Sequence, residues 1–190
     1  MKRFILLLVY IILIVATNGC RSSAGNGIEV IIDGGNGQFP DFLVGTWKAE
    51  EGGWGFVFEP DGQISSATVS IGRVKLRPGR KIAVPMQMGG KGVYKPGQWS
   101  VQYSYQQREL IVEITIDHFR VELGDDVIEG STRDFFVGPV STDGKSWWAD
   151  RLSFPEYVVN TDKFHNYKLP FDPTDNPRES ILFQKVTESK

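Results

Sequence analysis

Alternation of apolar and polar residues predicts β-strands over most of this chain. From Trp99 to Tyr105, aromatic and aliphatic side chains occupy every second position, and the same period returns from Leu110 to Ile116. Successive side chains of a strand point to opposite faces, so this period indicates two strands that each have one apolar and one polar face. Residues 106–109 are polar and predict the turn between them. The alternation resumes from Phe119 to Leu123, which predicts that the second strand continues.

A second hairpin is predicted earlier in the chain. An alternating aromatic segment, Trp54–Glu59, is followed by Pro60-Asp61-Gly62 and then by the returning segment Gln63–Ile71. Proline sets one turn dihedral and glycine accepts a positive φ, so this tripeptide favours a hairpin turn. Further strands are expected at Val127–Val137, Ser146–Phe154 and Ser180–Val186, the last of which would close the sheet, with an irregular proline-rich excursion at Asn160–Arg178 before it.

Helical periodicity is not convincing in any stretch of ten or more residues after the first twenty. Short strands separated by turn signals are typical of a β-sandwich or an up-and-down barrel. Without its first 19 residues and a short tether, the chain has about 150 residues, which is a usual length for one domain. We therefore expect a single all-β domain.

The N-terminus carries a different pattern. Lys2 and Arg3 precede a 13-residue apolar run, Phe4–Ala16, and the run ends shortly before Gly19-Cys20. A basic start, an apolar core and a small residue before the break describe a secretory signal peptide. The run is shorter than the roughly 18–20 residues that span a bilayer core as a helix.

Cys20 is the only cysteine of the chain, and its position at the cleavage edge resembles a bacterial lipoprotein signal. The resemblance implies cleavage before Cys20 and lipidation of its sulfur with fatty acyl chains such as palmitate. Two or more chains hold a protein stably to a membrane, whereas one chain does so only marginally. An uncleaved anchor helix and a plain signal peptide are the alternatives. The expected location is the bacterial cell envelope, and Arg21 in place of an aspartate favours the outer membrane where the organism has one.

These boundaries divide the chain into three parts. Residues 1–19 form the expected signal peptide, residues 20–38 a flexible tether, and residues 39–190 the folded domain. Glycine, serine and asparagine dominate the tether, a composition typical of flexible linkers. Within it, Ile28–Ile32 is apolar enough to add a short strand.

Several short motifs together resemble the lipocalin-like (calycin-type) domains. They are the Gly-x-Trp of Leu43–Lys48, the aromatic strand and turn of Trp54–Gly62, the pairs Gly92–Tyr94 and Gly97–Val101 before Glu109–Val112, and Ile128–Gly130 before Trp147-Trp148. The resemblance implies an eight-stranded antiparallel up-and-down barrel. It also implies that Trp47 closes one end of that barrel, in a structural role.

Composition excludes several classes of function. The formal charge is −2, and removal of residues 1–19 takes away two basic and no acidic residues, which gives about −4. No basic stripe of the kind that neutralises nucleic-acid phosphates is present, so nucleic acid is not an expected partner. With Cys20 as the sole cysteine, the domain has no disulfide and no thiolate metal site. A hydrophobic content of 41 per cent is ample for a core.

Catalytic motifs are missing, and we do not expect an enzyme or a cofactor. The chain has no Gly-x-Ser-x-Gly, His-Glu-x-x-His, P-loop or dinucleotide-binding glycine motif. His118 beside Asp117 is the best candidate for a general base, and an exposed turn pair is the plainer interpretation. A metal site built from His118 and His165 is not expected, and the loop residues Asp172, Asp175 and Asn176 are typical turn formers rather than calcium ligands.

Aromatic residues make up 12 per cent of the chain and are its best candidates for ligand binding. A small barrel is either filled by its own side chains or left hollow for one apolar ligand. The candidate ligand-binding residues are Trp99, Tyr103, Tyr105 and Trp147. The adjacent residues Trp147 and Trp148 point to opposite faces, so one of the two is expected outside the barrel or at its rim. There it could stack on a sugar ring, contact a partner or pack against the proline-rich excursion. The leading prediction is non-catalytic binding of a small hydrophobic or amphipathic ligand inside the barrel. The alternative is a filled barrel that serves as an envelope protein-interaction or assembly module.

Overall fold

The computed structural model describes residues 20–24, 28–69, 74–86, 90–124, 126–160 and 178–187. The expected signal peptide, His165, Asp172, Asp175 and Asn176 lie outside these residues. The strands are β1 (Cys20–Ala24), β2 (Ile28–Asp33), β3 (Gly45–Ala49), β4 (Gly55–Phe58), β5 (Ile64–Val69), β6 (Val74–Leu76), β7 (Ile82–Pro85), β8 (Lys91–Pro96), β9 (Trp99–Ser104), β10 (Glu109–Leu123), β11 (Asp126–Pro139), β12 (Ser146–Asn160) and β13 (Arg178–Lys185), with one 3-10 turn at Gly35–Gly37.

The all-β prediction is confirmed, and the strands belong to one mixed sheet. Its hydrogen-bonded order is β1-β2-β9-β10-β11-β12-β13-β3-β4-β5-β6, with β8 paired to β10 and β7 to β8. The last strand, β13, is present as expected and pairs with β3, which joins the two parts of the sheet. Among the described strands, however, the path has free ends at β1 and β6, and β2 pairs with β9 in parallel. An eight-stranded antiparallel barrel is therefore not confirmed.

Both predicted hairpins are present. Between β4 and β5, Gly62 adopts φ 83° and its N–H donates to the Glu59 carbonyl at 2.9 Å. A Cβ at Gly62 would come within 2.8 Å of Phe39, so both the backbone angle and the space favour glycine. Strands β9 and β10 are joined across Ser104↔Glu109. Strand β10 then continues to Leu123, as the resumed alternation predicts, past a register shift between Ile116 and Phe119.

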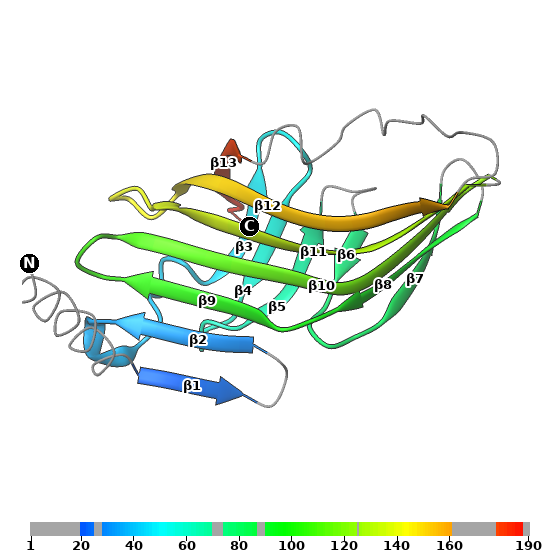
Figure 1. Ribbon diagram of the computed structural model, residues 1–190. Helices are drawn as coiled ribbons and strands as arrows, with labels where there is room; N and C mark the ends of the chain where they lie inside the picture. Colours follow the sequence, from blue (N-terminus) through cyan, green and yellow to red (C-terminus); the bar gives the residue numbers. More distant parts are fainter. Residues whose placement is uncertain are drawn as a thin grey trace, which may run out of the picture.

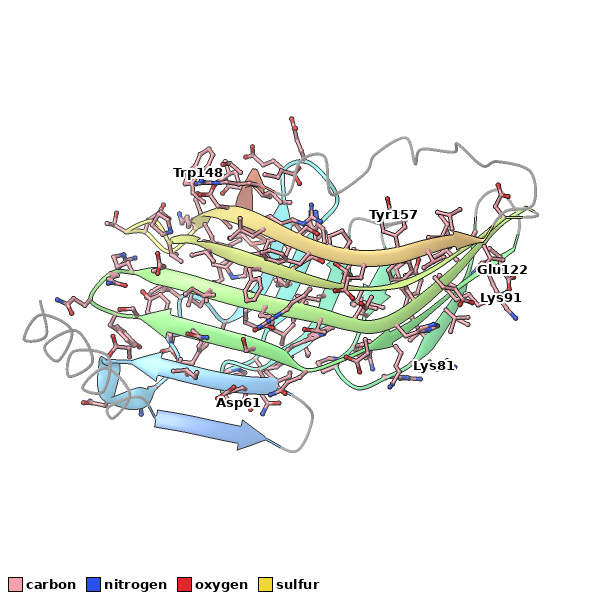
Figure 2. The ribbon with its side chains drawn as sticks, in the orientation of Figure 1. Asp61, Lys81, Lys91, Glu122, Trp148 and Tyr157 are labelled. Atoms are coloured by element: carbon pink, nitrogen blue, oxygen red, sulfur yellow. The ribbon has the colours of Figure 1, made fainter. Side chains whose placement is uncertain are left out.

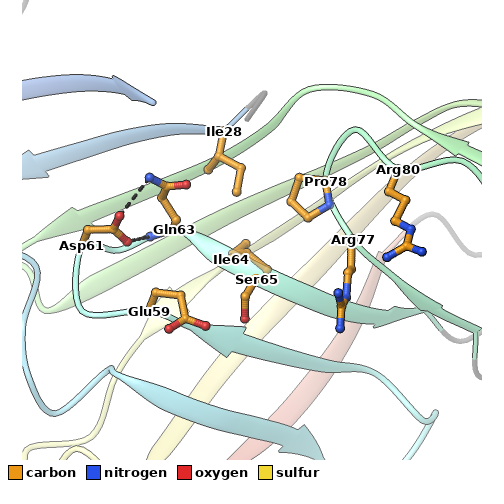
Figure 3. A pocket seen from close by; sticks show the side chains of 9 residues that line it. All are labelled: Ile28, Glu59, Asp61, Gln63, Ile64, Ser65, Arg77, Pro78 and Arg80. Atoms are coloured by element: carbon orange, nitrogen blue, oxygen red, sulfur yellow. Dashed lines mark hydrogen bonds between the residues drawn. The ribbon is translucent and has the colours of Figure 1, made fainter. Parts of the chain in front are cut away.

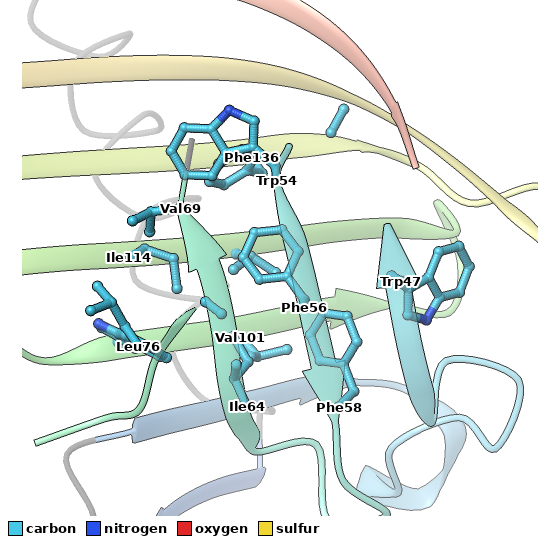
Figure 4. Close-up of a cluster of buried hydrophobic side chains, with 14 of the residues drawn as sticks. Trp47, Trp54, Phe56, Phe58, Ile64, Val69, Leu76, Val101, Ile114 and Phe136 are labelled. Atoms are coloured by element: carbon cyan, nitrogen blue, oxygen red, sulfur yellow. The ribbon is translucent and has the colours of Figure 1, made fainter. Parts of the chain in front are cut away.

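The sheet curls back on itself, so that it forms two layers (Figure 1). Long strands β10, β11 and β12 span the view, and β3, β4, β5 and β6 cross behind them. The core lies between these layers, where β4 and β5 pack against β9, β10 and β11 (Figure 4). Phe56 of β4, for example, makes an edge contact with Phe136 of β11 at a centroid distance of 5.1 Å. Trp47 is fully buried, and its indole N–H donates to the Leu43 carbonyl at 2.8 Å.

Within the expected tether, Ile28–Asp33 forms β2, the short strand that the apolar run Ile28–Ile32 predicts. Ile28, Val30 and Ile32 alternate along this strand and are each at most 3 % exposed. They lie beside β9 in the parallel register Ile28↔Trp99, which completes the core at that edge. Burial of these apolar side chains stabilises the ordered strand, while the surrounding glycines and asparagine favoured the linker interpretation. Strand β1 then pairs with β2 in antiparallel register. The described part of the chain contains no helix with the length and apolarity needed to cross a membrane.

Candidate binding groove on the outer face of the sheet

The interior side chains predicted to bind a ligand are packed into the core. Trp99 is fully buried, and its indole N–H donates to the Thr115 carbonyl at 3.0 Å. Tyr103, four residues further along β9, is 2 % exposed. Its ring makes an edge contact with the Phe42 ring at a centroid distance of 6.0 Å. Burial raises the pKa of the Tyr103 phenol above its ordinary value. The polar end of Trp99 is thus already satisfied by the chain itself.

Trp147 belongs to a separate aromatic cluster. Its ring stacks on Phe183 at a centroid distance of 4.8 Å and lies 5.9 Å from Phe56. Its indole N–H donates to the Gly138 carbonyl at 3.2 Å, and no part of the side chain reaches solvent. Interlocked rings of this kind fill space to the density of a protein core. Trp147 is therefore a packing residue in this structure.

Tyr105 closes the end of β9 over the neighbouring turn. Its hydroxyl donates to the Gln38 carbonyl at 3.0 Å, and its ring meets Tyr103 edge-on at 5.1 Å. A Cβ on Gly35 would collide with the Tyr105 ring, so the turn packs closely beneath it. The structure brings Tyr103 and Tyr105 together and places Trp147 elsewhere. Alternation alone could not show this, since the same pattern describes hollow and filled interiors.

Trp148 has the opposite environment, as the alternation predicts. Its side chain is 57 % exposed on the outer face of β12, where Figure 2 shows it at the edge of the molecule. It borders a cavity of about 530 Å³ that lies over β10, β11, β12 and β13. The cavity is lined by the apolar residues Val137, Pro139, Trp148, Ala149 and Leu152, by Gly138, and by the polar residues Glu109, Asp150, Arg178 and Ser180. We call this cavity the Trp148 groove.

Polar groups on one side of the Trp148 groove hold each other in place. The Asp150 carboxylate accepts hydrogen bonds from the Ser180 hydroxyl and from the Arg178 guanidinium, both at 2.6 Å. These two bonds lower the pKa of Asp150, so it is ionised at neutral pH. The groove therefore offers a fixed carboxylate, a cation and a hydroxyl beside an exposed indole. That combination suits a ligand with one apolar face and several hydroxyl groups.

The sheet itself is interrupted beneath the Trp148 groove. Regular pairing between β11 and β12 ends at Val137↔Asp150 and resumes only as the isolated bridge Val140↔Trp147. Gly138 occupies the gap, and a Cβ there would collide with the backbone oxygen of Trp148. A glycine at this position lets β11 approach β12 closely.

Apolar exposure continues along β12 beyond the groove. Phe154 is 57 % and Val158 72 % exposed, and both share the outward face of the strand with Trp148. Phe154 contacts the Phe135 ring edge-on at 6.0 Å, and the Arg133 guanidinium lies 4.6 Å from the Phe135 centroid. These side chains form an exposed row along one face of β12, and such a row becomes a contact surface where its members join into one patch.

The candidate general base lies on the exposed surface. Asp117 and His118 are both exposed, at the register shift in β10. The Asp117 carboxylate is 3.7 Å from the Lys95 ammonium, and no hydrogen bond joins it to His118 in the described structure. Neither residue lines the Trp148 groove. Within the described residues, no three His, Cys, Asp or Glu side chains are grouped so as to hold a metal ion.

Comparisons with known proteins do not assign the chain to a family. It matches no protein-family model, no curated protein sequence and no solved structure. The two resemblances noted in the sequence therefore remain predictions, and function is argued from the geometry of the site.

Proposed function

We propose that this chain is a lipid-anchored, non-catalytic binding protein of the bacterial envelope that takes its ligand at the Trp148 groove rather than inside the sheet. The observation that carries the proposal is the contrast between adjacent tryptophans: Trp147 is wholly buried among aromatic rings, whereas Trp148 is 57 % exposed beside a cavity. The domain would be a lipocalin-like barrel filled by its own side chains, an interpretation supported by the pairing of β13 with the Gly-x-Trp strand β3.

The ligand class that fits the Trp148 groove is a saccharide. A sugar ring is amphipathic, with a face of C–H groups that stacks on an indole and hydroxyl groups that point outward around the ring. In the groove those hydroxyls would meet the ionised Asp150, Arg178 and Ser180. Burial of about 60 Å² of apolar surface at roughly 25 cal/mol per Å² corresponds to about 1.5 kcal/mol, or about tenfold in affinity.

Titration calorimetry of the purified protein with chitotriose and maltotriose tests this assignment. We expect millimolar or tighter binding of at least one sugar, and a loss of about tenfold in affinity in Trp148→Ala. Phe154→Ala is the matched control, because Phe154 is also 57 % exposed on the same face of β12 but does not line the groove. Unchanged affinity in Trp148→Ala, or the same loss in both variants, contradicts the assignment.

A second candidate is an envelope protein-interaction module, and the exposed row of Phe154 and Val158 favours it. A protein partner would cover the row along β12 in addition to the groove. Photo-crosslinking from position 154 in the host would then give one defined product that disappears in Val158→Asp. Sugar binding that depends on Trp148 alone, with no such product, supports the saccharide assignment.

Anchoring through Cys20 is the remaining part of the proposal, and it is supported by the signal pattern of residues 1–20. Strand β1 begins at Cys20, whose backbone pairs with Ile32 of the sheet. The acylated residue would then be the first residue of the sheet's edge strand. The domain would therefore stand close to the bilayer surface.

A further inference from the structure

A second cavity, of about 410 Å³, lies away from the Trp148 groove, where the β4–β5 hairpin approaches the turn between β6 and β7 (Figure 3). Its floor is apolar, because Ile28 of β2 and Ile64 of β5 are 3 % and 0 % exposed. Polar residues surround this floor: Glu59, Asp61, Gln63, Ser65, Arg77 and Arg80. We call it the hairpin cavity. Its size is within the range of small-molecule sites.

One end of the hairpin cavity is cationic. Arg77 and Arg80 flank the tight turn Pro78-Gly79, which is closed by an N–H of Arg80 that donates to the Arg77 carbonyl at 3.2 Å. Neither guanidinium has a hydrogen-bond or ion-pair partner within the described structure. The other arginines with described side chains are engaged: Arg108 with backbone carbonyls, Arg120 with Glu129, Arg133 with Glu113, Arg151 with Asp134 and Arg178 with Asp150. Both side chains are exposed, and their neighbouring guanidinium groups offer the planar, charged donors that suit an oxyanion.

The opposite end of the hairpin cavity is anionic. The Asp61 carboxylate is held by Gln63, whose backbone N–H and side-chain amide donate to it at 3.0 and 2.9 Å. Glu59 also lines the cavity, and within the described structure its carboxylate accepts no hydrogen bond. Figure 3 shows these two carboxylates on the side of the cavity away from Arg77 and Arg80. Among the described residues no ion pair connects the two ends, so both charges remain available at the cavity.

We propose that the hairpin cavity binds a small zwitterion, with its oxyanion on Arg77 and Arg80 and its ammonium group at Glu59 and Asp61. A molecule with both charges satisfies both ends at once, whereas a simple anion would also meet the two carboxylates. Its short carbon chain would lie over Ile28 and Ile64. Phosphoethanolamine has this chemistry, either as a free molecule or as the headgroup of phosphatidylethanolamine. The site is separate from the Trp148 groove, so the two proposals stand or fail independently.

Calorimetry with phosphoethanolamine, using inorganic phosphate and ethanolamine as the separate halves, tests this inference. We expect phosphoethanolamine to bind more tightly than either half. Arg77→Gln/Arg80→Gln should weaken it by about tenfold or more, since charge-assisted hydrogen bonds are lost. Glu59→Gln should weaken phosphoethanolamine but not inorganic phosphate. Arg133→Gln, on the outer face of β11, is the matched control and should leave binding unchanged.

Vesicles distinguish the two sources of the headgroup. Retention of the purified protein on phosphatidylethanolamine vesicles, and not on phosphatidylcholine vesicles, supports the lipid if it depends on Arg77 and Arg80. Binding of free phosphoethanolamine without vesicle retention supports a soluble zwitterion. Circular dichroism establishes that each variant is folded. The inference is overturned if phosphoethanolamine does not bind the folded wild type, or binds the double arginine variant equally well.

Discussion

A buried ion pair at the end of the core gives the sharpest prediction about stability. Asp134 of β11 is only 4 % exposed in its side chain, and the Arg151 guanidinium donates to its Oδ1 at 2.9 and 3.1 Å. Thr132 donates to the other oxygen at 3.1 Å. Arg151 in turn lies 4.6 Å from the Trp54 ring centroid. Substitution Arg151→Met keeps much of the aliphatic length and removes the charge.

We expect Arg151→Met to lower the free energy of unfolding by a large amount, because the substitution leaves the buried Asp134 carboxylate without its cation. Without Arg151, a carboxylate that is almost wholly buried keeps one neutral donor, and breaking such a pair from one side costs about 3–5 kcal/mol. The lost contact with Trp54 adds about 0.5–2 kcal/mol. The double variant Arg151→Met/Asp134→Asn has no unpaired carboxylate, so it should regain part of the lost free energy of unfolding. The coupling energy should be at least about 1.5 kcal/mol.

Urea unfolding followed by tryptophan fluorescence measures the free energy of unfolding of the four proteins in this double-mutant cycle: the wild type, Arg151→Met, Asp134→Asn and the double variant. The exposed pair Lys95–Asp117, with side chains 62 % and 46 % exposed, is the matched control and should show coupling of about 1 kcal/mol or less. If the losses at Arg151 and Asp134 add to within about 0.5 kcal/mol, the claim that this pair is desolvated is refuted.

Three further predictions concern other positions. Trp147→Ala should lower the free energy of unfolding by about 3–5 kcal/mol, whereas Trp148→Ala should change it by about 0.5 kcal/mol or less; urea midpoints that fall equally in both would contradict their placement. Burial raises the pKa of Tyr94, whose hydroxyl is buried with no hydrogen-bond partner in the described structure. Its contribution to stability is therefore complete below pH 10, the ordinary tyrosine value, and is lost as pH rises above that, because only the unfolded state then ionises readily. Tyr94→Phe should be neutral or stabilising at pH 7, and the urea midpoint of this variant should decrease less at alkaline pH than that of the wild type. Destabilisation by more than about 1 kcal/mol at pH 7 would show that the hydroxyl has a partner. Cys20→Ala should abolish incorporation of labelled palmitate in the host, and persistent labelling would exclude Cys20 as the acylated residue.

Local alternation was enough to predict much of the sheet. The hairpin of β9 and β10 and the turn at Gly62 follow from short-range patterns, because side-chain alternation and turn chemistry are set by neighbouring residues. Strand β12 continues to Asn160, past the expected end at Phe154, since Tyr157 and Val159 keep the inward alternation of partly buried side chains. The parallel pairing of β2 with β9 is a contact between distant segments, and no local pattern in Ile28–Ile32 specifies that partner.

The binding sites were less accessible to prediction. Alternation correctly placed Trp147 and Trp148 on opposite faces of the strand. It could not show that Trp99 and Trp147 would pack fully into the core and so be unavailable to a ligand. That outcome depends on how rings from β4, β11 and β13 interlock. Arg77 and Arg80 were not identified as candidates. The signal was present, because they flank a Pro-Gly turn in a segment rich in basic residues, but the carboxylates opposite them come from another hairpin.

Fluorine NMR of the purified protein labelled with 5-fluorotryptophan tests the central claim most directly, namely that the interior is filled and the ligand binds outside. The five tryptophans give separate probes, and single Trp→Phe variants assign each resonance. On titration with the better-binding trisaccharide, we expect the Trp148 resonance to shift while those of Trp99 and Trp147 stay unchanged, and a fatty-acid titration to shift neither buried resonance. Movement of the Trp99 and Trp147 resonances with a fatty acid, with that of Trp148 unmoved, would show that the sheet encloses its ligand and would contradict the account.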